Sequence, residues 1–117
     1  MFGIDSVVSF VTLALDAAAL RQQAIANNIA NVGSVGYVPL RVNFEEQLAF
    51  ARGDLAAAGV PAGARPFIEA DTSGATAVML DVEMVKLAQN AVHYQSLLKA
   101  LDKHLAIMSA AVNEGRR

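Results

Sequence analysis

Two long stretches, one near each end of the chain, place apolar residues at alternating steps of three and four. The N-terminal stripe comprises Ile4, Val8, Val11, Leu15, Ala18, Gln22, Ile25 and Ile29. The C-terminal stripe comprises Ala77, Leu80, Met84, Leu87, Ala91, Tyr94, Leu98, Leu101, Leu105, Met108 and Val112. This spacing is typical of a helix that packs along a second helix in a coiled coil. We therefore expect an all-α fold in which two long terminal helices pack antiparallel as a coiled-coil-like pair.

Helix-breaking residues set the expected boundaries within a single domain. The N-terminal helix is predicted over residues 4–31, capped by Asp5 or Ser6 and ended by asparagines and glycines. Residues 32–53 are predicted to form a turn and an extended arm, with a short helix over 45–51. Of the 24 residues in 54–77, 16 are Ala, Gly, Pro, Ser or Thr, which predicts a flexible loop over 54–76. The C-terminal helix is predicted over 77–113.

Composition indicates a protein that needs partners. Hydrophobic residues make up 55% of the 117 residues, but aromatic residues only 6%, and two helices rich in alanine cannot enclose a large core alone. The net charge of −2 with scattered charges gives no indication of a nucleic-acid partner. Asp5 and Asp16 flank the apolar run Val7–Leu15, so we expect neither a cleaved signal peptide nor direct membrane insertion.

The residues give no support for an enzyme. His93 and His104 are eleven positions apart, which separates them by about 16 Å along a helix, too far to share a metal ion. The sequence contains neither G-x-x-x-x-G-K-[ST] nor G-x-G-x-x-G, the two glycine-rich patterns that bind phosphate groups. We therefore expect no catalytic, cofactor-binding or metal-binding residues.

Polar residues at two places in the first helix are open to two interpretations. Gln22 is the polar member of its stripe, and it either sets the register of the helix pair or faces water. The run Asn27-Asn28-Ile29-Ala30-Asn31 either simply ends the helix or forms a specific turn or subunit contact.

The stretch from Arg21 to Phe44 resembles the signature of bacterial flagellar axial proteins of the rod and hook class. The matching residues are Asn28, Ile29, Ala30, Asn31, Gly36, Tyr37 and Phe44, with Ser34-Val35 where Thr-Pro is usual. The stretch from Leu80 to Gln95 resembles the C-terminal part of the same proteins through Glu83, Met84, Leu87, Ala88, Asn90 and Tyr94. Within the class, the short chain resembles the small proximal-rod subunit best, and the other short rod subunit next.

The resemblance implies a structural subunit that polymerises through its terminal helices into the periplasmic drive shaft of the flagellum and transmits torque. It implies export without a cleaved signal peptide, and as partners copies of the chain, other rod subunits, the junction between MS ring and rod, and the export gate. The expected assembly interface comprises Val8, Val11, Leu15, Ile25, Asn28, Ile29, Asn31, Gly36, Tyr37, Phe44, Leu80, Met84, Leu87, Tyr94, Leu98, Leu101, Leu105 and Met108. The alternative from a different class is a coiled-coil adaptor or secretion chaperone that binds a partner's amphipathic helix.

Overall fold

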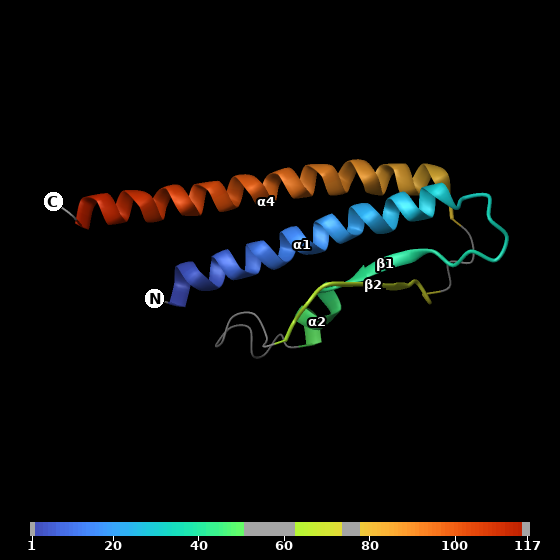
Figure 1. Cartoon of the computed structure of the whole chain (residues 1–117), viewed down its shortest axis with the longest axis horizontal. Helices are drawn as coiled ribbons and strands as arrows, with labels where there is room; N and C mark the ends of the chain where they lie inside the picture. Colours follow the sequence, from blue (N-terminus) through green and yellow to red (C-terminus); the bar gives the residue numbers. More distant parts are fainter. Residues whose placement is uncertain (1, 51–62, 74–77, 116–117) are drawn as a thin grey trace.

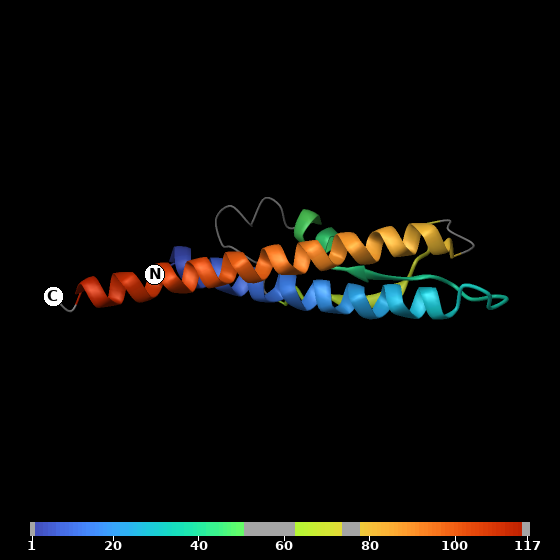
Figure 2. The same ribbon diagram turned by 90° about the horizontal axis from the view of Figure 1, so that it is seen from above.

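The computed structural model describes residues 2–50, 63–73 and 78–115, and for residues 2–5 and 49–50 the backbone alone. The elements in chain order are α1 (Phe2–Ala30), β1 (Leu40–Asn43), α2 (Glu45–Phe50), β2 (Phe67–Ala70) and α4 (Leu80–Gly115). Figures 1 and 2 show α1 and α4 side by side and antiparallel, so that the first turns of α1 and the last turns of α4 lie towards the same end of an elongated molecule. Its extents are 65 × 28 × 15 Å. The predicted fold, two long helices packed antiparallel, is confirmed.

The helix ends differ from the predicted ones. Because α1 begins at Phe2, Asp5 and Ser6 lie inside the helix, and the prediction that either residue caps it is wrong. At the other end, the N–H group of Asn31 donates to the carbonyl of Asn27 at 3.1 Å, and the Asn31 side-chain amide donates to the same carbonyl at 2.8 Å. Helix α4 begins at Leu80 rather than at residue 77, which lies outside the described residues.

A two-stranded antiparallel ribbon lies along α1 on the side away from α4 (Figure 1). Leu40 of β1 is opposite Ala70 of β2, and Asn43 is opposite Phe67. Strand β1 lies in the predicted extended arm, and α2 corresponds to the predicted short helix. The loop prediction is wrong over Phe67–Ala70, because a four-residue strand in a segment rich in small residues carries too short a pattern to be recognised. Residues 51–62 of the predicted arm and loop lie outside the described part.

Helix α1 is the middle layer of the molecule and is buried on two faces. Val11, Ala18 and Ile25, seven positions apart in the N-terminal stripe, are all buried. A second row faces the ribbon, where Ala14, Ala17 and Ala24 pack with Val42 and Phe44. Leu13, Leu20, Leu40, Leu48 and Ile68 pack against this cluster, and Leu97 packs against it from α4. The alanines allow the neighbouring backbones to approach α1 closely.

Candidate assembly site

Asn28, in the last turn of α1, is only 2% exposed and connects three parts of the fold. Its Nδ2 donates to the carbonyl of Leu40 at 3.0 Å and to Oε2 of Glu83 at 3.3 Å. Its Oδ1 accepts from the N–H of Leu40 and from the hydroxyl of Tyr37, both at 2.8 Å. The Asn28 side chain thus bonds to both the carbonyl and the N–H of Leu40, as the backbone of a neighbouring strand would. We call Asn28, Tyr37, Leu40 and Glu83 the asparagine hub.

Glu83 and Tyr37 are the titratable members of the hub. The Glu83 side chain is buried, and Nζ of Lys86 lies 3.4 Å from its Oε1. Burial raises the pKa of the Tyr37 hydroxyl, and the negative charge of Glu83 raises it further. The hydroxyl therefore stays protonated at neutral pH and can donate to Asn28.

The turn after the hub requires a glycine. Gly36 has φ = +79°, a conformation that glycine adopts readily and β-branched residues do not. A Cβ atom added at Gly36 would meet no heavy atom within 4 Å, so the requirement comes from the backbone conformation alone. Ser34, where the rod signature usually has threonine, donates its N–H to the carbonyl of Asn31 at 3.0 Å. The run of asparagines thus forms a specific turn rather than a simple helix stop.

Asn90 connects α4 to α1 through its side chain. It is buried, and its Nδ2 donates to the carbonyl of Ala18 at 2.9 Å and to Oε1 of Gln22 at 3.0 Å. Its Oδ1 is buried without a hydrogen-bond partner among the described residues. Gln22 therefore accepts a hydrogen bond across the helix pair and is also exposed to solvent, so the structure leaves both interpretations of this residue open.

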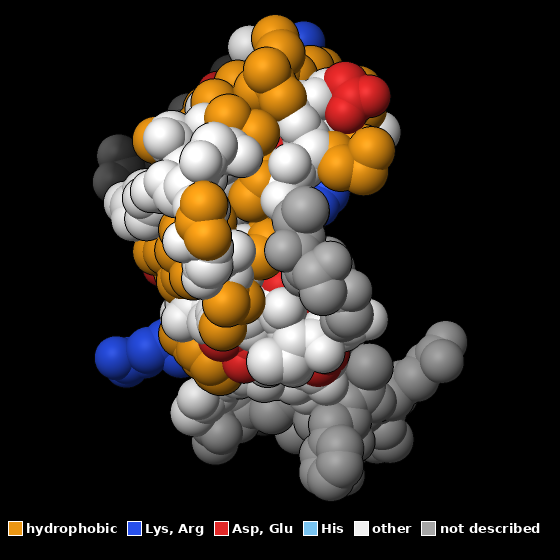
Figure 3. All heavy atoms as spheres, turned by 90° about the vertical axis from the view of Figure 1, so that its right-hand side faces the viewer, with side chains coloured by type: hydrophobic (Ala, Val, Ile, Leu, Met, Phe, Trp, Pro, Cys, Tyr) orange, Lys and Arg blue, Asp and Glu red, His pale blue; other side chains and the backbone are white. Residues whose placement is uncertain are grey.

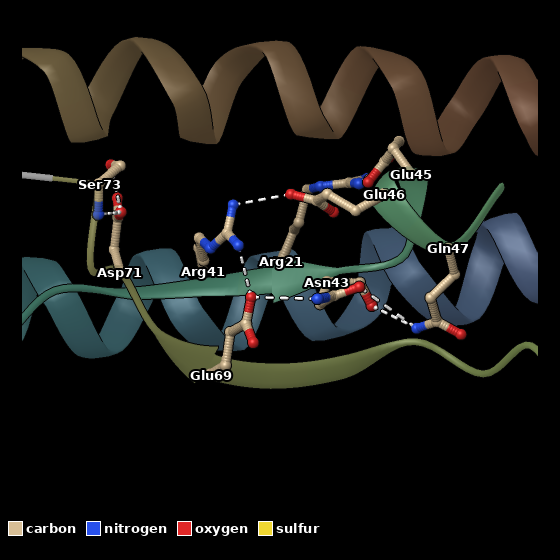
Figure 4. Close-up of polar contacts among 9 residues, drawn as sticks. All are labelled: Arg21, Arg41, Asn43, Glu45, Glu46, Gln47, Glu69, Asp71 and Ser73. Carbon is tan, nitrogen blue, oxygen red and sulfur yellow. Dashed lines mark hydrogen bonds and ion pairs between the residues drawn. The ribbon is translucent and has the colours of Figure 1, made fainter. Parts of the chain in front are cut away.

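Charged residues hold the ribbon and α2 together (Figure 4). Arg41 on β1 pairs with Glu46 at 2.7 Å and with Glu69 on β2 at 2.6 Å. Arg21 of α1 pairs with Glu45 at the start of α2. Bonds from backbone N–H groups lower the pKa of Glu46, and the positive charge of Arg41 lowers it further. These pairs connect α1, α2 and both strands into one unit.

Helix α4 presents an inner face to α1 and an apolar outer face to solvent. The inner face carries Glu83, Asn90, Leu97 and His104 at a spacing of seven, and all four are buried or partly buried. The outer face carries Leu80, Met84, Ala91, Leu98, Leu105 and Val112, and all six are exposed. The C-terminal stripe therefore lies partly against α1 and partly in solvent, because its residues span two adjacent rows of the helix.

The structure places the expected interface residues in three groups. Buried inside the chain are Val11, Ile25, Asn28 and Phe44. Partly buried are Val8, Leu15, Ile29, Asn31, Tyr37, Leu87, Leu101 and Met108. Exposed are Gly36, Leu80, Met84, Tyr94, Leu98 and Leu105. The hub residues are brought together within the chain, whereas the exposed group lies mainly along α4.

Sequence reasoning missed the roles of two polar residues on α4. From the sequence, Glu83 and Asn90 were identified only as residues that match the rod and hook class. The signal that could have revealed them is the spacing of seven from Glu83 through Asn90 and Leu97 to His104. Because Glu83 and Asn90 are polar, this row was not recognised from the sequence as the one that faces α1.

The histidines are not part of a metal site in the described segments, where no group of three or more His, Cys, Asp or Glu residues could hold an ion. His93 lines an open groove of about 360 Å³ between α1, β1 and α4. The cations Arg21, Arg41 and Lys86 in this groove are each paired with a carboxylate. No helix within the described segments combines the length and apolar character needed to cross a bilayer.

Comparison with known proteins supports a relation to the flagellar rod. No family model matches the chain. The chain is similar to the flagellar basal body rod protein FlgB of Bacillus subtilis strain 168, with 28% identity over 116 residues, which cover 88% of this chain and 90% of the relative.

Proposed function

We propose that the chain is a structural subunit of the bacterial flagellar basal-body rod, of the proximal FlgB type. It assembles through its long helices into the periplasmic shaft that transmits torque. The similarity to a FlgB protein over most of both chains supports this proposal. The resemblance of the segment from Asn28 to Tyr37 also supports it, because those residues build the hub and the turn.

The exposed row of α4 carries the proposal. Met84 is 56% exposed, Leu98 39% and Leu105 47%, and the row from Leu80 to Val112 extends over about 48 Å of helix. A long apolar row exposed on a helix whose other side is already packed is suited to a further helix. In the proposed rod, that helix comes from a neighbouring copy or from another rod subunit, and the first copies contact the junction between MS ring and rod and the export gate. The chain is proposed to reach that position without a cleaved signal peptide.

Replacement of Leu98 by aspartate tests the proposal in a bacterium that depends on this chain for its rod. The chain should be produced and exported, but motility and the number of basal bodies seen by electron microscopy should be strongly reduced. Gln95→Asp, also on an exposed part of α4, is the matched control and should remain motile. Full motility of Leu98→Asp would contradict assembly through this row.

Two other assignments are separated by their partners. A rod subunit of the FlgC type would give the same motility phenotype but would occupy a different position, which cryo-electron microscopy of isolated basal bodies would show. A coiled-coil adaptor or secretion chaperone would bind a partner helix without becoming part of the rod. Absence of the chain from purified basal bodies would favour that alternative.

A further inference from the structure

Strand β1 has one edge that β2 does not cover. The N–H of Asp71 donates to the carbonyl of Pro39 at 2.8 Å, so these two residues form a hydrogen-bonded pair of the antiparallel ribbon. Bonded and non-bonded pairs alternate along such a ladder. The backbone groups of Leu40 and Val42 therefore point away from β2, towards the opposite edge.

Most of this edge is occupied by other parts of the chain. The Asn28 amide bonds to the carbonyl and the N–H of Leu40 at 3.0 and 2.8 Å, so it lies where a residue of a third strand would lie. Beyond the other end of β1, the carbonyl of Phe44 accepts from the N–H of Leu48 at 3.2 Å. Between them, the N–H and carbonyl of Val42 have no such partner among the described residues. An edge residue left open in this way can pair with one more strand.

Val42 lines the groove of about 360 Å³ between α1, β1 and α4. Figure 3 views the molecule from the end that carries the turn and shows the surface hollowed between α4, at the top, and the part of the molecule below it. The wall on α4 extends from Glu83 to His93, which is about 15 Å of helix. This is about the length of four extended residues. The groove can therefore accommodate a short strand beside β1.

The residues that line the groove suit an uncharged peptide backbone. Its floor on α1 includes Ala24 and Ile25, which offer small apolar surface. Its wall on α4 carries the amides of Gln89 and Asn90, and the Oδ1 of Asn90 has no hydrogen-bond partner among the described residues. Each cation of the described lining is paired with a carboxylate. The groove therefore does not favour a ligand with a net charge.

We propose that this groove binds an extended segment of a partner protein, about four residues long, which adds to β1 as a third strand. The N–H and carbonyl groups on one edge of the segment bond to Val42. The groups on its other edge face the amides of Gln89 and Asn90. Every second side chain of the segment points towards Ala24 and Ile25, where small apolar residues fit best. The site is separate from the exposed row of α4 through which copies are proposed to assemble.

Nuclear magnetic resonance of the purified, isotopically labelled full-length chain tests the site. The probe is the blocked peptide acetyl-Thr-Val-Thr-Val-Thr-amide, whose residues favour an extended conformation. We expect the peptide to shift the amide resonance of Val42 in a saturable way and to slow the exchange of this amide with heavy water. The amide of Ile68 is the internal control, because Ile68 is opposite Val42 and its N–H points to the far edge of the ribbon.

A modified peptide distinguishes strand addition from simple adsorption of apolar side chains. The same peptide with every backbone nitrogen methylated keeps its side chains but cannot donate to the carbonyl of Val42. It should bind at least about ten times more weakly than the unmodified peptide.

Two matched substitutions on α4 test the location. Gln89→Trp places a bulky side chain at the wall of the groove. Gln95→Trp places the same side chain at another exposed residue of α4, which lines a different groove of the helix pair. The first substitution should weaken peptide binding at least about tenfold, and the second should leave it unchanged. Circular dichroism confirms that both variants keep the wild-type helix content.

Several outcomes would overturn the site. They are the absence of a shift at Val42 at the highest soluble peptide concentration, equal binding of the methylated peptide, full binding by Gln89→Trp, and a response of Ile68 equal to that of Val42. If the Val42 amide becomes protected as the concentration of the chain alone rises, the occupant is a second copy and the assignment to a partner protein is wrong. The motility of Leu98→Asp is independent of these results, so failure of this site and failure of the proposed function are distinguishable.

Discussion

At the scale of single residues, Asn28 has the most concentrated role. One side-chain amide bonds to the N–H and the carbonyl of Leu40, to the Tyr37 hydroxyl and to the Glu83 carboxylate. An amide is suited to this position because it offers donors and an acceptor together. A residue with only acceptors cannot replace it, even when its shape is the same.

Asn28→Asp should destabilise the chain by about 2 kcal/mol or more, because a carboxylate would face the Leu40 carbonyl and the Glu83 carboxylate without a donor. Urea unfolding followed by circular dichroism measures the change. Asn27→Asp is the matched control on the exposed side of the same turn, and its effect should stay within about 0.5 kcal/mol. Equal effects of the two substitutions would show that the hub bonds contribute nothing measurable.

The hub should also make stability depend on alkaline pH. Because the pKa of Tyr37 is raised in the folded chain above its ordinary value of 10.0, folding favours the protonated phenol. This contribution is complete below the unfolded pKa and is lost as the pH rises through the folded pKa. We therefore expect the wild type to be more stable than Tyr37→Phe at neutral pH, and this difference to shrink above about pH 10. Urea midpoints across this range, with Tyr94→Phe as control, measure it, and a constant difference would contradict the prediction.

Gly36→Val should cost about 1–3 kcal/mol, since the cost arises from a positive φ rather than from crowding. Gly33→Val is the matched control, because Gly33 is in the same turn with equally open surroundings and without a positive φ. Thermal unfolding of the two variants gives the comparison. A cost at Gly33 equal to that at Gly36 would mean that the turn tolerates valine equally at both places.

At the scale of elements, the sequence predicted the two long helices and their antiparallel pairing but only part of their packing. The spacing of Val11, Ala18 and Ile25 identified one buried face of α1 correctly, because seven-residue steps return to the same side of a helix. The face towards the ribbon was missed, because its alanines give little contrast with the exposed alanines nearby. Strand β2 was missed because its support comes from β1, which is distant in sequence.

The candidate site was predictable to a similar extent. The asparagine run and Gly36 stood out because both residue types tolerate turns. The identity of the partners of Asn28 could not be predicted, because Leu40 and Glu83 reach it only through the packing of two other elements.

Asn90 should set the register of α1 against α4. Asn90→Leu removes a buried amide whose Oδ1 has no partner in the described structure, so stability should be unchanged or higher, while pairings shifted by one heptad become accessible. Such a shift changes distances along the axis by about 10 Å. Spin labels on cysteines introduced at the exposed Gln23 and Gln95 should give one narrow distance in the wild-type background and a broader or second distribution with Asn90→Leu. An unchanged narrow distribution would show that other contacts fix the register.

At the scale of the whole molecule, the side of α4 on which a residue lies determines what its substitution disrupts. Leu101 is partly buried on the side towards α1, and Leu98 is exposed. Sequence alone assigned both residues to the same stripe and to the same expected assembly interface. Their different positions in the structure predict that substitution of Leu101 lowers the stability of the chain, whereas substitution of Leu98 affects its assembly.

Leu101→Asp should destabilise the isolated chain by about 3 kcal/mol or more, because it places a carboxylate within the helix pair. Leu98→Asp should change stability by less than about 1 kcal/mol, while still preventing the association of copies. Urea unfolding and sedimentation of the same two preparations measure both quantities. Similar stability losses in both variants would show that Leu98 also belongs to the packing within the chain.

The buried alanines of α1 have a mechanical consequence. Ala14, Ala17, Ala18 and Ala24 have no side-chain rotamers to change. If α4 or the ribbon is pushed along α1, side-chain rearrangement at these positions cannot absorb the displacement, and the load is transferred directly between backbones. We therefore expect α4, α1 and the ribbon to resist sliding past one another, so that the molecule behaves as one stiff unit. A shaft built from such units would transmit rotation with little twisting inside each subunit.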